Sequence, residues 1–506
     1  MWESIINGIT KVNDFLNNIV WGWPAIILIL GAGIVLSIRT KFLQLRKFGD
    51  SWKTTIIPTI KSLGKKREAD KGAISISQFE AFSAAISGTV GTGNIVGVVT
   101  AIITGGPGAV FWMWVCAFFG MVTNYSENIL GLYYRTKDKA GNFSGGAFYY
   151  IANGAKLKWL GYVAALFCML AAVGMSGVQT NTIAGALSSS IGSLTPSVNE
   201  NTLKLILGIV VAFFTGLIII GGIKRIGKVT SMLVPLMSLL FMILSIIMIL
   251  IHIDHLPKAL GMIFKYAFQF KAAAGGIFGY TFMVIVRKGM ARGVFSNEAG
   301  LGSSVIAHSA SETREPVKQG LWGVFEVFFD TFIICTLTSL MFLTTMDVNA
   351  FTGEENGTLM ALQMFSHNYG TFGTIAFSII LPLFAFTTIV AWSYYGEKAT
   401  EFFFQWLGEK GRKIAVMIFK VLFILLIIFA AVTNTSLAWA ISDTANGLMA
   451  IPNLIGLIIL SGTVVKLTKN YYERKNGKKI EPMLSAYPDL NEEFKKDIME
   501  GSDEKR

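Results

Sequence analysis

The sequence predicts an all-α integral membrane protein with about eleven transmembrane helices. Hydrophobic residues make up 53% of the 506 residues and charged residues only 15%, whereas about a quarter of the residues in a soluble domain are charged. Apolar runs of about 20 residues, the length that crosses a bilayer, follow one another from Trp21 to Thr468. The candidate spans are 21–38, 76–103, 108–133, 157–190, 203–221, 228–251, 272–290, 318–345, 371–395, 413–432 and 435–468.

The basic residues predict how these spans are oriented, because Lys and Arg accumulate in cytoplasmic loops. The loops 191–202 and 347–370 contain neither Lys nor Arg. We therefore expect the N-terminus outside and the C-terminus in the cytoplasm. A single last span, bent near Pro452, keeps the basic tail inside. The groups expected inside are Arg39–Arg67, Arg135–Lys139, Lys224–Lys228, Arg287–Arg292, Lys410–Lys413 and the tail after Lys466, while Lys258, Lys265 and Lys271 fall on an outer amphipathic stretch.

Three parts are expected along the chain. Residues 1–70 hold an extra N-terminal transmembrane helix and a cytoplasmic basic segment, residues 71–468 a ten-helix core, and residues 469–506 a polar, partly disordered cytoplasmic tail. The net charge of +12 is explained by membrane loops, so no nucleic-acid partner is expected. The sequence contains no Walker lysine motif, no HExxH motif and no credible catalytic triad, and enzymatic activity is therefore not expected.

The most informative stretch is Ser87–Asn94 (SGTVGTGN), which lies inside the second span. Its glycines and threonines are poor helix formers, and unwound backbone at membrane depth is tolerated where it lines a cavity or is buried in protein. An interrupted helix would offer carbonyls to a cation and free N–H groups to an anion. A zwitterion beside a sodium ion fits this pattern. The alternative is a close-packed helix interface of small residues.

A second glycine-rich stretch, Ala272–Gly279, lies in the seventh span. When the first span is set aside, the two glycine-rich spans become the first and the sixth of ten. Each then begins a five-span half, and the two halves have opposite orientation. Interruptions at matching places in inverted halves indicate a transporter binding site. A glycine-lined packing face is the alternative.

Further polar residues fall inside apolar runs. Gln179 is a candidate for the wall of the cavity, and the paired hydroxyls of Thr387 and Thr388 suit a hard cation, although threonines often bond to their own helix. Trp392 could close over a small substrate or fill the core. Glu326 and Asp330 share one helix face; carboxylates inside a membrane indicate function, but a structural pairing with a basic group is favoured.

Several segments resemble the alanine or glycine:cation symporters, a family of sodium-coupled amino-acid carriers. The similarity extends from about residue 10 to 468. It is carried by Ser87–Val98 (SGTVGTGNIVGV), Gly105–Trp114 (GGPGAVFWMW), Gly293–Ser303 (GVFSNEAGLGS), Ala391–Glu397 (AWSYYGE) and Leu448–Leu454 (LMAIPNL).

The resemblance implies a LeuT-type fold, with one extra N-terminal helix before a five-plus-five inverted repeat. It also implies import of alanine or glycine together with sodium. The substrate carboxylate is expected at Thr92, Gly93 and Asn94. The rest of the substrate is expected beside Gln179, Gly275, Gly276, Phe278, Gly279 and Trp392, and the sodium ion at the carbonyls of Ser87 and Val90 and the hydroxyls of Thr387 and Thr388.

Two inner segments depart from the family pattern. Residues Gly145–Tyr150 read GGAFYY where the family has Gly-Gly-Pro-Met-Tyr-Tyr, and Ser-Ser-Val follows Gly302 where it has Ser-Ala-Pro. Both departures bear on gating. The residues alone also leave open a proton-coupled carrier that uses Glu326 or Asp330, and an ion channel.

Overall fold

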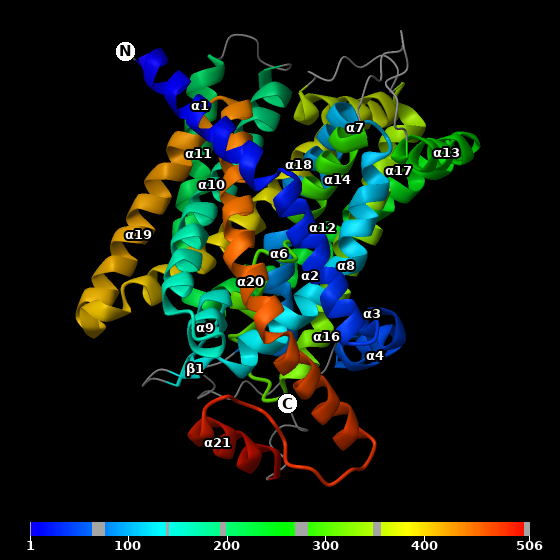
Figure 1. Cartoon of the computed structure of the whole chain (residues 1–506). Helices are drawn as coiled ribbons and strands as arrows, with labels where there is room; N and C mark the ends of the chain where they lie inside the picture. Colours follow the sequence, from blue (N-terminus) through cyan, green and yellow to red (C-terminus); the bar gives the residue numbers. More distant parts are fainter. Residues whose placement is uncertain are drawn as a thin grey trace.

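The computed structural model describes residues 2–62, 76–137, 141–192, 199–268, 282–347 and 356–499, which are mostly helical (Figure 1). In these residues the first half of the chain forms α1 (Trp2–Val20), α2 (Trp23–Arg39), α3 (Leu43–Arg46), α4 (Phe48–Thr54), α5 (Ile56–Ser62), α6 (Gln78–Thr89), the π-helical η1 (Gly93–Gly97), α7 (Val98–Gly105), α8 (Ala109–Tyr133), α9 (Ala147–Tyr149), the π-helical η2 (Tyr150–Gly154), α10 (Lys158–Gly192), α11 (Glu200–Ile219) and α12 (Gly222–Ile251). A short hairpin pairs β1 (Thr136–Lys137) with β2 (Phe143–Ser144).

The second half of the chain follows the same pattern of long apolar helices joined by short segments. It forms η3 (Ile253–His255), α13 (Leu256–Ala267), α14 (Phe282–Asn297), α15 (Ser304–His308), α16 (Pro316–Val327), the π-helical η4 (Phe328–Cys335), α17 (Thr336–Thr345), α18 (Gly357–Phe403), η6 (Gln405–Leu407), α19 (Gly408–Ala431), α20 (Thr435–Lys475) and α21 (Pro488–Met499).

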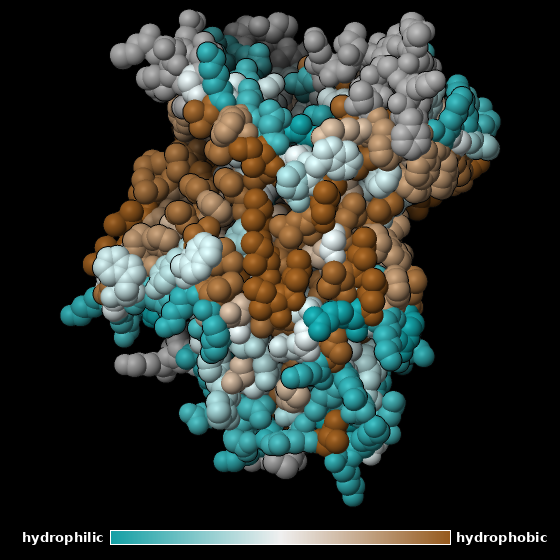
Figure 2. Space-filling view, viewed as in Figure 1, coloured by the Kyte–Doolittle hydropathy of each residue, from teal (hydrophilic) through white to brown (hydrophobic). Residues whose placement is uncertain are grey.

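The helices form a membrane domain. Among the described residues, eight helices are long and apolar enough to cross a membrane, or up to ten if each bent pair counts as one span. The predicted span 272–290 begins outside the described residues, so the count of about eleven stays a prediction. Figure 2 shows a broad hydrophobic band around the middle of the molecule, with hydrophilic residues at both ends. This distribution is the one expected for a chain whose belt faces lipid.

The two ends of the molecule are called here the N-terminal face, where α1 and α13 lie, and the C-terminal face, where α3, α9 and α21 lie (Figure 1). Helix α20 is continuous through Pro452, as the basic residues had predicted. The prediction that Arg287–Arg292 lies on the same side of the membrane as the C-terminal tail is wrong. Arg287 donates to Asn17 of α1 at 3.2 Å, because the basic group lies within α14 (Phe282–Asn297) and not in a loop after it.

The tail carries more structure than the sequence predicts. Helix α21 buries Leu490 and Phe494 against Phe143 of β2. The guanidinium of Arg135 lies 3.8 Å from the centre of the Phe143 ring, and Arg314 pairs with Asp497 of α21 at 2.8 Å. The tail therefore covers two loops of the C-terminal face, the one after α8 and the one before α16.

Candidate substrate and ion site

The predicted interruption of the first core helix is present. Helix α6 ends at Thr89 and helical structure resumes at Gly93, where η1 leads into α7 with the axes bent by 46°. Between them Val90 has φ −81° and ψ 88°, outside the helical region. The glycines weaken the helix here, and the segment is buried in protein, which is where unwound backbone is tolerated in a membrane.

Side chains of other elements surround the unwound backbone. The N–H of Thr92 donates to Gln179 Oε1 of α10 at 3.1 Å, and the N–H of Gly91 donates to Asn94 Oδ1 at 2.8 Å. The Thr92 hydroxyl is buried and has no hydrogen-bond partner among the described residues. A Cβ at Gly91 would lie 2.4 Å from Thr388 Oγ1 of α18. Gln179, Thr92 and Asn94 are thus brought together at the interruption.

The two threonines predicted at the sodium site behave differently. Thr388 Oγ1 lies 2.9 Å from the carbonyl of Ser87 at the end of α6, and 3.0 Å from the carbonyl of Phe384 in its own helix. Thr387 Oγ1 has carbonyl partners in its own helix, at 3.1 Å from that of Leu383 and 3.0 Å from that of Phe384. Of the predicted hydroxyl ligands, Thr388 is therefore the one that faces the predicted carbonyl.

Trp392 does not simply fill the core. Its indole N–H donates to Glu298 Oε1 at 2.9 Å, and Glu298 belongs to a segment that sequence reasoning did not assign to the site. The predicted contacts of Gly275–Gly279, that is of Gly275, Gly276, Phe278 and Gly279, lie outside the described residues.

The structure contains another interruption, between α14 and α15. Three residues there have positive φ: Glu298 (55°), Gly300 (94°) and Gly302 (73°). The N–H groups of Gly300 and Gly302 donate to Glu127 Oε1 of α8 at 3.1 and 3.0 Å. Asn453 of α20 donates to the same carboxylate oxygen at 2.5 Å. A buried carboxylate thus satisfies the backbone donors that the interruption releases.

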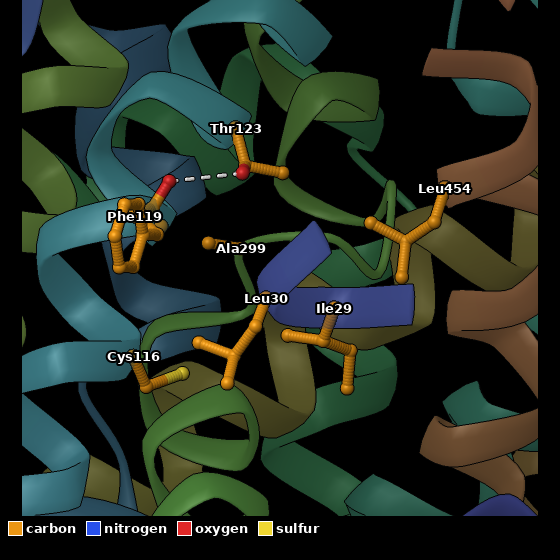
Figure 3. A pocket seen from close by; sticks show the side chains of 8 residues that line it. Ile29, Leu30, Cys116, Phe119, Thr123, Ala299 and Leu454 are labelled. Atoms are coloured by element: carbon orange, nitrogen blue, oxygen red, sulfur yellow. Dashed lines mark hydrogen bonds between the residues drawn. The ribbon is translucent and has the colours of Figure 1, made fainter. Parts of the chain in front are cut away.

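Apolar side chains pack behind this second interruption. Figure 3 shows Ala299 beside a small pocket, with Ile29 and Leu30 of α2, Cys116 and Phe119 of α8 and Leu454 of α20 around it. Helix α2 therefore packs against this segment.

A second buried carboxylate lies next to the first interruption. Asp330 of η4 accepts hydrogen bonds from Asn94 Nδ2 at 2.5 Å, Ser296 Oγ at 2.9 Å and Thr331 Oγ1 at 2.8 Å. No ion pair to Asp330 occurs in the part of the chain that the structure describes. The expected pairing with a basic group is wrong for Asp330, because neutral donors on three elements take its place.

Glu326 has the kind of partner that the sequence predicts. Its Oε2 lies 2.8 Å from His308 Nε2, and both side chains are fully buried.

An ion pair joins α14 to α20 near the first interruption. Arg292 pairs with Asp443 at 2.9 Å and lies over the ring of Trp439. A Cβ at Gly93 would lie 3.0 Å from the Phe295 ring.

Sequence reasoning missed Glu127, Ser296 and Glu298 as neighbours of the site. For Glu127 and Glu298 the available signal was the charge itself, because a carboxylate within an apolar run costs free energy unless it has partners. In Gly293–Ser303 the pair of glycines beside Glu298 also marked a break. This segment carries part of the family resemblance, and no interruption is predicted there from the sequence.

Two interrupted helices, buried polar side chains around them and a lipid-facing belt define the class of protein: a secondary transporter. The model of the sodium:alanine symporter family matches residues 6–485. The chain belongs to this family, whose members are transporters and not enzymes.

Individual relatives agree with this assignment. The chain is 40% identical to the sodium/alanine symporter AgcS of Methanococcus maripaludis over 468 residues, which cover 91% of this chain and 97% of that one. It is 36% identical to the putative sodium/proton-dependent alanine carrier protein YrbD of Bacillus subtilis, with 93% of each chain covered.

The solved structure of MhsT in complex with L-phenylalanine matches with a TM-score of 0.57 at 16% identity, covering 78% of this chain and 98% of that one. At this identity the match shows the fold alone, and the fold is the predicted LeuT type.

Proposed function

We propose that this protein is a sodium-coupled importer of alanine or glycine that works by alternating access. The observation that carries the proposal is the interruption at residues 90–92. At this interruption Gln179 and Asn94 lie beside Thr92, whose hydroxyl has no hydrogen-bond partner among the described residues. The Ser87 carbonyl, near the end of α6, faces Thr388 of α18.

The substrate carboxylate would bind at the start of η1. The N–H of Gly93 lies at the start of this helix, and helix N-termini favour anions; the N–H of Asn94 donates to the Gly91 carbonyl at 3.3 Å. The Thr92 hydroxyl and the amide of Gln179 are within reach of the same point. A Cβ on Gly91 would lie 2.4 Å from Thr388 Oγ1 and one on Gly93 would lie 3.0 Å from the Phe295 ring, so glycine is needed at these two backbone positions. Alanine or glycine as substrate is supported by the relative named as a sodium/alanine symporter.

The sodium ion would bind at the carbonyls of Ser87 and Val90 and the hydroxyl of Thr388. These are the hard oxygen ligands that such cations prefer, and the C-terminal end of α6 carries a partial negative charge. Thr387 joins this site only if its hydroxyl turns away from the carbonyls of Leu383 and Phe384.

The direction of transport follows from orientation in the membrane. We place the C-terminal face in the cytoplasm, because it carries most of the basic loops. Alternating access is supported by two contacts that join separate elements near the site. The Arg292–Asp443 pair lies toward the N-terminal face, and the Trp392–Glu298 contact lies beside the second interruption.

Coupling to protons is a second candidate, and Asp330 is the observation that favours it. A carboxylate buried among neutral donors can gain a proton without breaking an ion pair. It also contacts Asn94, next to the proposed carboxylate site. The relative YrbD bears a name that includes protons as well as sodium.

Uptake of labelled alanine into proteoliposomes tests the proposal. A sodium gradient alone should drive accumulation, a proton gradient alone should not, and internal unlabelled alanine should accelerate entry of the label by counterflow. Accumulation driven only by protons would replace sodium coupling with the second candidate. Non-saturating flux with unitary currents would instead identify a channel.

A further inference from the structure

We infer that Glu298 is the negative counter-charge of the sodium site, held beside the site by Trp392. This inference rests on the proposed sodium coupling and adds a residue that the sodium prediction did not contain. The oxygens proposed as sodium ligands are carbonyls and hydroxyls, which carry no formal charge. A buried cation needs a compensating charge nearby.

The position of Glu298 follows from two contacts. Its Oε1 accepts the indole N–H of Trp392 at 2.9 Å, and Trp392 lies four residues after Thr388 on α18. The same Oε1 lies 3.3 Å from the point that a Cβ on Gly88 would occupy. Gly88 adjoins Ser87, and neighbouring Cα atoms are about 3.8 Å apart. The carboxylate therefore lies beside the end of α6 that offers the proposed sodium ligands.

The residues around Glu298 leave its charge without a counter-ion. Its Oε2 accepts a hydrogen bond from Ser303 Oγ at 2.5 Å, and its Oε1 accepts the one from Trp392. No Lys, Arg or His forms an ion pair with it in the ranges that the structure describes. Both donors are neutral, so a cation bound near Ser87 would supply the missing positive charge.

The backbone at Glu298 points to a functional role. Its φ of 55° is in the left-handed region, which residues other than glycine seldom adopt. Strain of this kind is concentrated at functional sites. The backbone of the interruption is stabilised by another carboxylate, Glu127, which accepts hydrogen bonds from the N–H groups of Gly300 and Gly302. Glu298 instead reaches across to α18.

This arrangement connects the sodium site with the second interruption. A cation beside Ser87 attracts the Glu298 carboxylate and so favours the packed arrangement of α6, α18 and the segment before α15. Loss of the cation leaves a buried charge with two neutral donors, which favours separation of these elements. Sodium would thereby stabilise the closed arrangement on this side of the substrate site.

Glu298→Gln tests the inference, because the amide keeps the shape of the side chain and an acceptor for Trp392 while it removes the charge. We measure labelled alanine uptake in proteoliposomes as a function of sodium concentration. The sodium concentration for half-maximal uptake should rise about thirtyfold, as expected for the loss of a charge about 8 Å away at an effective dielectric constant of about 20. At saturating sodium the KM for alanine should change by less than about twofold.

Glu127→Gln is the matched control, since it neutralises a buried carboxylate on the same interruption. It should lower the maximal rate of uptake without changing the sodium concentration for half-maximal uptake. An unchanged sodium requirement in Glu298→Gln overturns the inference, and so does an equal increase in both variants. If Glu298→Gln does not transport, sodium-dependent thermal stabilisation of the purified protein replaces uptake, and wild-type sodium dependence in that assay also overturns it.

The wild-type protein separates this inference from the proposed function. Wild-type uptake that needs no sodium contradicts both. Wild-type uptake that needs sodium, together with an unchanged sodium requirement in Glu298→Gln, contradicts only the role of Glu298.

Discussion

Replacing Thr388 by valine should weaken sodium coupling, because the change removes one hydroxyl and keeps the volume of the side chain. In the structure this hydroxyl donates to the Ser87 carbonyl at 2.9 Å. Its loss removes a proposed cation ligand and leaves a buried carbonyl without that donor. A lost hydrogen bond of this kind costs about 1–2 kcal/mol. Since about 1.4 kcal/mol corresponds to a factor of ten, the sodium concentration for half-maximal uptake should rise roughly five- to thirtyfold.

The neighbouring Thr387→Val provides the comparison. Its hydroxyl bonds to carbonyls of its own helix, so we expect the sodium requirement to change by less than about threefold. Uptake of labelled alanine is measured over a range of sodium concentrations, and the melting temperature of each purified variant checks folding. A wild-type sodium requirement in Thr388→Val refutes the reasoning. So does a larger effect at Thr387, which would mean that its hydroxyl turns toward the ion.

Three further predictions concern other parts of the molecule. Asn94→Ala removes the side chain that accepts from Gly91 and donates to Asp330; it should raise the KM for alanine about tenfold or more, and an unchanged KM would remove this residue from the substrate site. Asp330→Asn places an amide opposite three donors and should lower stability by about 1–3 kcal/mol, measured as a lower melting temperature; an unchanged value would show that the donors reorient freely. Phe494→Ala removes the ring packed against Phe143 and should release α21, measured as faster trypsin cleavage of the tail; equal cleavage rates would contradict the docking.

Hydropathy and glycine content were sufficient to predict the membrane fold and the first interruption. Apolar runs of sufficient length have few alternatives to helices inside lipid, and Ser87–Asn94 combines glycines with Asn94 in the middle of such a run. Gln179 was a candidate for the cavity wall because it is a polar residue inside an apolar run, but its contact with Thr92 could not be predicted, because no local pattern connects the interruption with α10. The sequence could not predict whether the Thr387 hydroxyl faces the sodium site or its own helix. Carbonyl acceptors are present in both places, and the structure shows the hydroxyl bonded to its own helix.

The basic residues show where a local rule fails. Counting Lys and Arg assigns a group to the cytoplasm on the assumption that it lies in a loop. Arg292 instead lies within α14, where Asp443 neutralises its charge, and Arg287 reaches the side chain of Asn17. Neither partner is near in the sequence. The rule therefore holds for solvated loops and fails for charges that tertiary contacts bring into a helix packed in protein.

The second interruption shows the same limit more directly. Two glycines and a glutamate in 298–302 are compatible with a helix end, a turn or a break. The choice depends on whether the released N–H groups find acceptors inside the membrane. Glu127 supplies that acceptor from a helix more than one hundred and fifty residues earlier in the chain, at 3.0 and 3.1 Å. A sequence shows which carboxylates are costly to bury; the donors that compensate each one are determined by how the helices pack.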